Sequence, residues 1–581
     1  MTCAPSPITA KPITAKETAT SSPAVAAPPC QGGKATGADA DAGAEPVPAW
    51  LAGFDSGAAT LIDVRPILGE GREPIADVLT TADALPQSGG LIILAPFNPA
   101  PLRSLLHERG FATYGRRLGE GRWTIRVVRL TASPATSKAP RPAPPRAPGG
   151  AGLKLGGAAQ RLLPEMVPLR FFGVALFAHA TAWAGLVVFA DEVSGFHGGP
   201  GPMLGVLHLV AVGVLLATAM GASFQMLPVA FALLPPPSWL CNLAFTLLVA
   251  GGAGLISGFA LFWPEMMIGG AFMLGGAVAL HAATLAGLVW RAGDNSLLRW
   301  HIGAALTALA VAVALAIALA LDFRLGWLDG HQRVALAHLV LAGFGFMGLF
   351  VLGFSQILIP MFAVADPAGE RLGQTAFALA LAAVTSAAAG ALTEARPLLI
   401  LGIAAGFAAA LSHIAQMLLM LRRRMRTRLG PEFLLIGLAW LILPVSLAMA
   451  LALVLEIGPE MLPGLFGFSL IFGWYLTFLL GVLQRILPFL ASMHASRLGA
   501  KALAPAKLAS GDHLAVHRWC HFSALILVAA GLILDNGWII RIGGLTGLAG
   551  ALAFILFGAE VLKRTRAHIA ALPRPPKESH S

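Results

Sequence analysis

The sequence is poor in charge, in tyrosine and in cysteine. Only 12% of its 581 residues are charged, while 56% are hydrophobic; a soluble globular domain carries about 25% charged residues. A chain this apolar cannot cover itself with a water-facing surface, so we expect lipid to be its main solvent. Its two tyrosines are Tyr114 and Tyr475, so the apolar region has one phenol at most.

The cysteines and the N-terminal segment exclude two further classes of protein. The four cysteines are far apart and form no CxxC pair: Cys3, Cys30, Cys241 and Cys520. This spacing argues against a disulfide framework or a cysteine metal site. The segment 1–48 is rich in Ala, Pro, Thr and Gly and contains no apolar h-region, so the sequence predicts no signal peptide.

The net charge of +11 would suit a nucleic-acid partner, but its distribution does not. Most Lys and Arg residues lie at the ends of apolar runs or in linkers. This is the positive-inside pattern of a membrane protein. We therefore expect a lipid bilayer as partner, and no nucleic acid.

The composition divides the chain into five parts. The predicted parts are a disordered tail (1–48), a small α/β domain (49–131), a Pro/Gly/basic linker (132–164), a membrane domain (165–566) and a basic cytoplasmic tail (567–581). In the small domain, alternating and helical patterns follow the order βαβαββ, with the last two strands separated by Gly119–Gly121. That order predicts a two-layer α/β fold.

The membrane domain contains twelve apolar runs. About 20 apolar residues cross a hydrocarbon core of about 30 Å. The predicted spans are 168–190, 203–232, 238–262, 266–290, 299–321, 334–362, 374–393, 397–421, 432–455, 462–490, 516–534 and 540–561. The fold class is therefore a polytopic α-helical membrane protein with about twelve transmembrane helices behind a small α/β domain.

Basic residues predict the orientation of these spans. Five arginines between 422 and 428 fill the eighth connection, and Lys563, Arg564 and Arg566 follow the last span. The first outer loop, DEVSGFHGGPG, has acids but no Lys or Arg. The positive-inside rule then places both termini in the cytoplasm, in what we expect to be a bacterial inner membrane.

Spans two, six and ten share a pattern. Each has two glycines eight apart, then a glutamine and a proline: Gly213, Gly221, Gln225 and Pro228; Gly345, Gly353, Gln356 and Pro360; Gly473, Gly481, Gln484 and Pro488. The prolines recur at nearly equal intervals, each of which matches the length of four helices. We expect three four-helix repeats. The glycines and prolines suit helix packing, and the glutamines suit either a buried partner or a polar path.

Histidines are the candidate ligands in the membrane. His208 and His338 lie near the outer starts of spans two and six, so they share a depth and form a candidate heme-ligand pair. His281 and His413 are separated by the same repeat interval and share a second depth, and His179 can join them as metal ligands. The alternative for each is a hydrogen bond between helices. His513, His517 and His521 share one helix face, which could bind a metal but which we expect to be solvated or to face lipid headgroups.

The membrane region resembles subunit I of the heme–copper oxidases and nitric oxide reductases, which has twelve spans in three four-helix arcs. The stretch from His208 to Pro228 is similar to that family's second helix, and the resemblance implies that His208 is an axial ligand of a heme b. Phe466 and Phe468 stand where the repeat would place a histidine in span ten, and the chain has no His-His dipeptide. A complete heme–copper centre is therefore not expected. The NnrS-type heme- and copper-containing membrane proteins are a more distant resemblance.

The 49–131 segment resembles the TusA/SirA-like fold, because LIDVRP is similar to its opening strand. Sulfur carriers of that fold place Cys-Pro at the start of the first helix, where this chain has Glu73-Pro74. Without the thiol, sulfur relay is not expected, and a docking module for a cytoplasmic partner is. Asp63, Arg65 and Glu73 form either a polar binding edge or a structural salt bridge.

Together these features predict a heme-binding membrane protein of bacterial respiratory or nitrogen-oxide metabolism. We expect electron transfer or nitric oxide handling, with a cytochrome or quinol as electron donor, heme b as cofactor and copper or another metal as a second candidate. The catalytic residues, if there are any, are unknown. The alternatives are a transporter whose glutamines and histidines line a polar path, and an accessory scaffold without heme.

Overall fold

The computed structural model describes residues 48–69, 74–86, 89–96, 99–119, 122–129, 161–196, 198–293, 296–426, 428–497, 507–508 and 510–571. The predicted disordered tail, nearly all of the predicted linker, Glu73 and most of the predicted C-terminal tail lie outside these residues.

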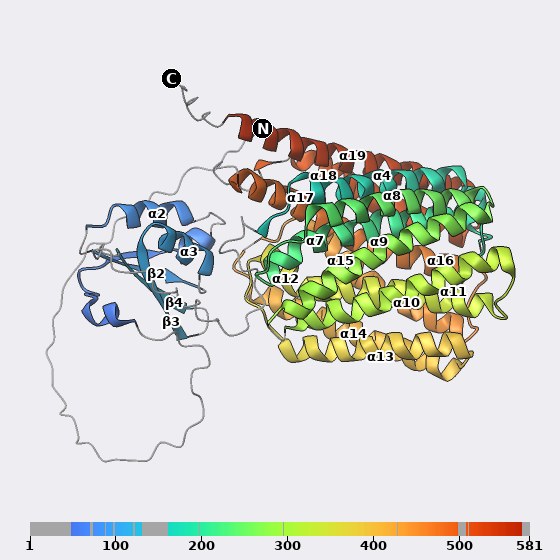
Figure 1. Ribbon diagram of the computed structural model, residues 1–581, viewed down its shortest axis with the longest axis horizontal. Helices are drawn as coiled ribbons and strands as arrows, with labels where there is room; N and C mark the ends of the chain where they lie inside the picture. Colours follow the sequence, from blue (N-terminus) through green and yellow to red (C-terminus); the bar gives the residue numbers. More distant parts are fainter. Residues whose placement is uncertain are drawn as a thin grey trace, which may run out of the picture. The chain divides into compact units, whose positions relative to one another are not determined.

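The small domain has the predicted strands in the predicted order, with two helices instead of one between the first and second strands (Figure 1). Its elements are η1 (Ala49–Gly53), β1 (Thr60–Asp63), α1 (Arg65–Gly69), α2 (Ile75–Asp83), β2 (Gly90–Ala95), α3 (Ala100–Glu108), β3 (Phe111–Gly119) and β4 (Arg122–Arg129). The sheet order is β1-β2-β4-β3, with β1 parallel to β2 and the other pairs antiparallel. Val78, Ile93, Leu106 and Ile125 are fully buried in a core that is separate from that of the membrane helices.

Twelve helices in the described part of the chain are long and apolar enough to cross a membrane. Nine spans are single helices: α4 (Met166–Val188), α8 (Ser238–Ala260), α9 (Pro264–Arg291), α10 (Leu297–Leu325), α13 (Glu370–Thr393), α14 (Arg396–Arg422), α15 (Glu432–Val454), α18 (Gly511–Ile533) and α19 (Gly537–Ala570). The short helix α5 (Ala190–Val193) follows α4. The last span is longer than predicted, because α19 continues through the basic residues after 561.

The second, sixth and tenth spans are each interrupted by a π-helical segment. The second consists of α6 (Pro202–His208), η3 (Leu209–Leu216) and α7 (Ala217–Ala230), and the sixth of α11 (His331–Leu339), η4 (Val340–Gly348) and α12 (Leu349–Ala363). The tenth consists of α16 (Leu462–Phe468), η5 (Ser469–Leu476) and α17 (Thr477–Arg497). We call these three spans the central helices, because most of their residues are buried. π-helical turns are rare and occur frequently at functional sites.

The paired glycines of each central helix bring the preceding span close. A Cβ atom at Gly221 would lie 2.6 Å from the Phe171 Cβ, and one at Gly353 would lie 2.6 Å from the His301 Cβ. The nearest residues on the preceding spans are Phe171 and Ala178 of α4, His301 and Ala308 of α10, and Ile436 and Ile442 of α15. Small residues at such crossings allow backbones to approach closely in a membrane.

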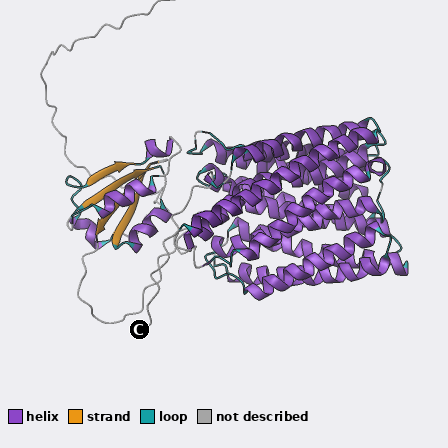
Figure 2. Ribbon diagram, turned by 90° about the horizontal axis from the view of Figure 1, so that it is seen from above, coloured by secondary structure: helices purple, strands orange, loops and turns teal. Residues whose placement is uncertain are grey.

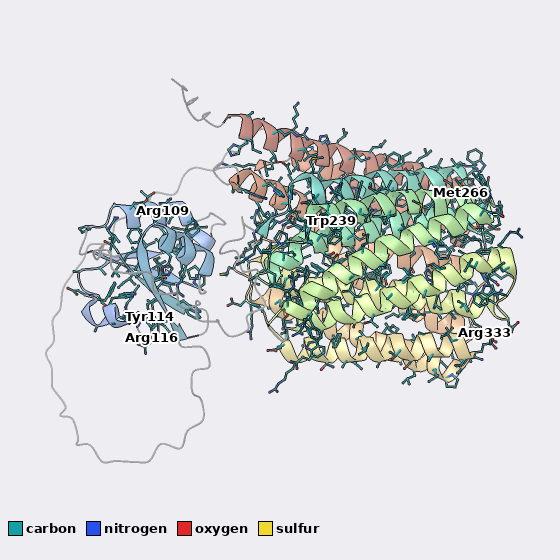
Figure 3. The ribbon with its side chains drawn as sticks, viewed as in Figure 1. Arg109, Tyr114, Arg116, Trp239, Met266 and Arg333 are labelled. Carbon is teal, nitrogen blue, oxygen red and sulfur yellow. The ribbon has the colours of Figure 1, made fainter. Side chains whose placement is uncertain are left out.

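The membrane helices run side by side, and successive spans alternate in direction (Figures 1 and 2). Met266 in the first turn of α9 and Arg333 in the first turn of α11 lie at the same end of the bundle (Figure 3). Twelve crossings also place the start of α4 and the end of α19 on one side. Large apolar side chains cover the outside, including Phe177 at 72% exposure and Trp239 at 63%. Such a surface requires a lipid environment.

Candidate functional site: the buried histidines

His208 and His338, which we call the outer histidine pair, have the same hydrogen-bond arrangement. His208 Nδ1 donates to the Leu204 carbonyl oxygen at 2.9 Å, and His338 Nδ1 donates to the Ala312 carbonyl oxygen of α10 at 2.8 Å. A carbonyl only accepts, so Nδ1 carries the proton and Nε2 keeps its lone pair. Neither Nε2 has a hydrogen-bond partner within the described chain. Both side chains are half-buried.

The outer histidine pair stands just before two of the π-helical segments. His208 is the residue that precedes η3, and His338 is two residues before η4. The Phe259 ring of α8 packs on the His208 imidazole with a centroid separation of 4.8 Å. The two histidines therefore lie on two central helices, each with its tautomer fixed by a backbone carbonyl.

His281, one of the predicted metal ligands, is fully buried on α9 and bonded to a serine of α7. Its Nε2 lies 2.9 Å from Ser223 Oγ, which also donates to the Met220 carbonyl oxygen at 3.1 Å. The imidazole N–H therefore donates to the hydroxyl oxygen, and Nδ1 has no partner in the described chain. This contact is the helix–helix hydrogen bond that was the alternative to metal ligation.

His413 of α14 is buried, and neither of its ring nitrogens has a hydrogen-bond partner among the described residues. His301 of α10 is buried as well. His301 Nδ1 donates to the Leu297 carbonyl oxygen at 2.8 Å, while its Nε2 is unpaired. The Phe377 ring of α13 lies 4.8 Å from the His301 ring.

His179 of α4 lies beside His517 and His521 of α18. We call these three residues the inner histidine cluster. The prediction that His517 and His521 face solvent or lipid headgroups is wrong, because they are 0% and 1% exposed. Glycines on α19 allow α4 and α18 to pack closely against it. A side chain at Gly547 would collide with Trp183, and one at Gly550 would lie 3.2 Å from the His517 carbonyl oxygen. The glycine spacing on the last span was the sequence signal for this burial.

The structure does not bring His179, His281 and His413 together. Each has a separate environment: His179 contacts α18, His281 contacts α7, and His413 lies near the start of α10. Among the described residues, no group of three or more His, Cys, Asp or Glu side chains is placed to hold a metal ion. Metal binding by these three residues stays a prediction.

The three repeated glutamines are buried but have different partners. Gln225 Oε1 accepts from the Leu163 backbone N–H at 3.1 Å, which ties the segment before α4 to α7. Gln356 and Gln416 of α14 bond to each other. The side-chain amide of Gln484 has no partner at either atom within the described part of the chain. Gln416 belongs to no repeated sequence pattern, and its hydrogen-bond partner lies on a helix 60 residues away.

Tyr475 lies within η5 and is 1% exposed. Its hydroxyl has no hydrogen-bond partner in the described chain and faces Gly343 of η4, where a Cβ atom would lie 3.6 Å from it. The Trp474 ring covers it at a centroid separation of 4.0 Å. Two of the π-helical segments therefore meet around this phenol.

In the small domain, Asp63 and Arg65 form the salt bridge that was one of the two alternatives. Arg65 Nη2 donates to Asp63 Oδ2 at 2.6 Å, and Arg65 Nε donates to Oδ1 at 2.8 Å. The hydrogen bond from Arg65 holds the pKa of the Asp63 carboxyl below its usual value. Tyr114 and Arg116 lie on β3 of the same domain (Figure 3).

Comparison with known proteins covers the small domain only. Residues 61–129 match the model of an uncharacterized conserved protein family, DUF2249. This segment is a DUF2249 domain. A search of the curated proteins finds no match to the chain. The resemblance of the membrane domain to heme–copper oxidase subunit I and to NnrS-type proteins has no support from these comparisons.

Proposed function

We propose that this chain is a heme-binding integral membrane protein in which His208 and His338 are the axial ligands of a heme b. The observation that carries the proposal is the shared state of the outer histidine pair, with both Nδ1 protons bonded to backbone carbonyls and both Nε2 lone pairs free. A ligating histidine almost always donates its other ring N–H to a carbonyl, a carboxylate or water. That bond sets the tautomer and makes Nε2 more basic.

The residues around the pair support electron transfer rather than oxygen reduction. A heme with two histidine ligands supplies one-electron chemistry and offers no open position for a substrate. The chain has no His-His dipeptide, and the described residues contain no group of three or more metal-binding side chains placed to hold an ion. We propose a role in respiratory or nitric oxide metabolism, with a cytochrome or quinol as electron donor and without a complete heme–copper centre.

We further propose that the membrane domain consists of three four-helix units around the central helices. The three π-helical segments and the three sets of glycine contacts with the preceding spans support this arrangement. Under it, the outer histidine pair joins the central helices of the first two units. The positive-inside pattern supports cytoplasmic termini in a bacterial inner membrane, and the DUF2249 domain would then bind a cytoplasmic partner.

A transporter is the second candidate. The buried amide of Gln484 has no partner at either atom among the described residues, and unpaired intramembrane polar groups often mark a substrate path. Substrate flux in proteoliposomes made with heme-free protein would favour this function over the first. Retained function after loss of every membrane histidine would instead favour an accessory scaffold.

Absorption spectroscopy of detergent-purified protein tests the proposal. We expect a Soret band and a low-spin, two-histidine spectrum that both His208→Ala and His338→Ala remove. His331→Ala is the matched control, because His331 lies on the same helix as His338 and bonds to Asp322. A folded, colourless wild-type protein would contradict the proposal, as would a Soret band that survives in the His208→Ala/His338→Ala double variant.

A further inference from the structure

An apolar groove runs between the eighth and ninth spans, α14 and α15. Its α14 wall consists of residues three or four apart, which therefore share one helix face: Ile414, Leu418 and Leu421. Its α15 wall has the same period and consists of Phe433, Gly437, Trp440, Leu441, Pro444 and Val445. Leu429, in the connection between the two helices, completes the lining, and the groove has a volume of about 550 Å³.

The groove is open to lipid and is as long as one leaflet is thick. Leu418 and Leu441 are 48% and 66% exposed, and large exposed apolar residues on a membrane bundle face lipid. From Phe433 to Val445 the α15 wall rises by about 18 Å. The hydrocarbon layer of one leaflet is about 15 Å thick, half of the full core. One acyl chain therefore fits along this wall.

Two residues of the α15 wall leave space and a free donor. A Cβ atom at Gly437 would meet nothing within 4 Å, so the middle of the groove is hollow. Trp440 is 8% exposed, and its indole N–H has no hydrogen-bond partner among the described residues. A buried indole N–H usually has an acceptor. A ligand with both a hydrocarbon chain and an acceptor oxygen would suit this wall.

The connection between α14 and α15 places arginines at one end of the groove. Arg422 directly follows Leu421, and Arg428 directly precedes Leu429. These two side chains and that of Arg423 are exposed, and no guanidinium of the three forms a hydrogen bond or an ion pair within the described residues.

The buried acid at the start of α15 does not neutralise these arginines. Glu432 Oε1 lies 3.5 Å from Arg485 Nε of α17, and this ion pair occupies the carboxylate. The end of the groove therefore carries an excess of positive charge beside an apolar channel.

We propose that this groove binds an anionic phospholipid, with one acyl chain along α15 and the phosphate on Arg422, Arg423 and Arg428. The guanidinium group matches phosphate oxygens in a bidentate geometry, and basic residues at a membrane surface attract anionic lipids. The ester carbonyl oxygens lie between the phosphate and the chain, so they supply an acceptor for the Trp440 N–H. A peptide strand would suit the groove less well, because the apolar walls cannot bond its backbone groups.

The bound lipid would stabilise the contact between spans eight and nine. In the proposed three-unit arrangement, these spans are the last of the second unit and the first of the third. A ligand that binds only the folded protein raises its stability by mass action. The lipid site shares no residue with the outer histidine pair, so it does not depend on heme binding.

Fluorescence quenching tests the proposal in the full-length protein, delipidated in detergent. Phosphatidylglycerol with bromine on one acyl chain should cause saturable quenching that Trp440→Phe removes. Phosphatidylcholine with the same chain should bind at least about fivefold more weakly, since each basic residue at the surface contributes about a factor of five. Equal affinity for the two lipids would overturn the proposal, and so would saturable quenching that persists in Trp440→Phe. Competition by glycerol phosphate, which has no acyl chain, would assign the arginines to a soluble phosphate instead.

Removing charge at the groove should weaken only the anionic lipid. Arg422→Gln/Arg423→Gln should lower the affinity for phosphatidylglycerol at least about fivefold and leave that for phosphatidylcholine unchanged. Lys563→Gln/Arg566→Gln is the matched control, because it removes two exposed basic residues near the end of α19. Equal losses in the two double variants would reduce the effect to general surface charge and contradict a specific site.

Filling the groove separates the acyl chain from the headgroup. Gly437→Leu places a side chain in open space, and Gly173→Leu on α4 does the same at another exposed glycine. Phosphatidylglycerol should raise the melting temperature of the wild type and of Gly173→Leu but not that of Gly437→Leu. Melting without lipid checks that both variants fold. An undiminished shift in Gly437→Leu would overturn the proposal, while heme absorbance in the same samples reports separately on His208 and His338.

Discussion

Gln356 and Gln416 exchange two hydrogen bonds in the membrane domain, from Gln356 Nε2 to Gln416 Oε1 at 3.0 Å and from Gln416 Nε2 to Gln356 Oε1 at 2.7 Å. Each amide satisfies the other, so the pair joins α12 of the sixth span to α14 of the eighth without water. In an apolar environment a buried amide without a partner is costly, so this pair should stabilise the contact between the two spans.

Removing one member of this pair should destabilise the protein more than removing both. Gln416→Met leaves Gln356 Oε1 buried without its partner, which costs about 1–3 kcal/mol. Gln356→Met/Gln416→Met removes both polar groups and should recover much of that loss. Thermal unfolding in detergent measures the difference, with Gln374→Met as control because Gln374 is exposed on α13. Additive losses in the double variant would contradict the pairing.

Of two adjacent glycines on α9, Gly269 and Gly270, only Gly270 should be sensitive to an added methyl group, because it lies at the contact with α8. A Cβ atom at Gly270 would collide with the backbone N–H of Leu255, whereas one at Gly269 would meet nothing within 4 Å. We expect Gly270→Ala to destabilise the protein by about 1–3 kcal/mol. Gly269→Ala should be neutral or stabilising by up to about 1 kcal/mol, because alanine is the better helix former. Equal melting temperatures for the two variants would exclude this close contact.

The salt bridge between Asp63 and Arg65 should make the stability of the small domain depend on pH. The pKa of Asp63 is lower in the folded state than its ordinary value of 3.8, mainly because of the hydrogen bond from Arg65. A lowered folded-state pKa adds stability above the unfolded-state pKa, and that stability is lost as the pH falls through the folded-state value. Asp63→Asn should therefore slightly lower the melting temperature at neutral pH and have no effect in strong acid.

The small domain has its own core, so a fragment of residues 48–131 suits this measurement. Arg65→Met should flatten the same part of the pH profile, because it removes the partner of the carboxylate. The effect is small, since the side chains of Arg65 and Asp63 are 42% and 33% exposed and water screens their attraction. A pH profile that neither variant changes would show that the ion pair adds no stability.

Cysteine labelling in intact cells should establish the orientation. In a variant without native cysteines, Ser194→Cys lies between the first two spans and Arg428→Cys between the eighth and ninth. The positive-inside rule predicts that a membrane-impermeant maleimide labels the first position and not the second. The reverse labelling would place both chain ends outside.

Several parts of the architecture follow from the sequence alone. The twelve spans and the order of elements in the small domain depend on the length and period of apolar runs, which are local properties of the chain. Gly213, Gly221 and their counterparts in the sixth and tenth spans also marked the close helix crossings in advance. Local patterns did not predict the π-helical segments, because the apolar runs in which they lie are equally suited to an α-helix.

The environments of the membrane histidines were decided by tertiary structure. His517 and His521 resemble an interfacial stripe when read along one helix, and only the packing of α18 against α4 and α19 buries them. The proton positions on His179 and His338 likewise depend on Trp183 and on the Ala312 carbonyl. The sequence determines which segments can lie in lipid, because that depends on the composition of each long apolar run. Which nitrogen keeps a free lone pair depends instead on the single atom of another helix that lies beside it.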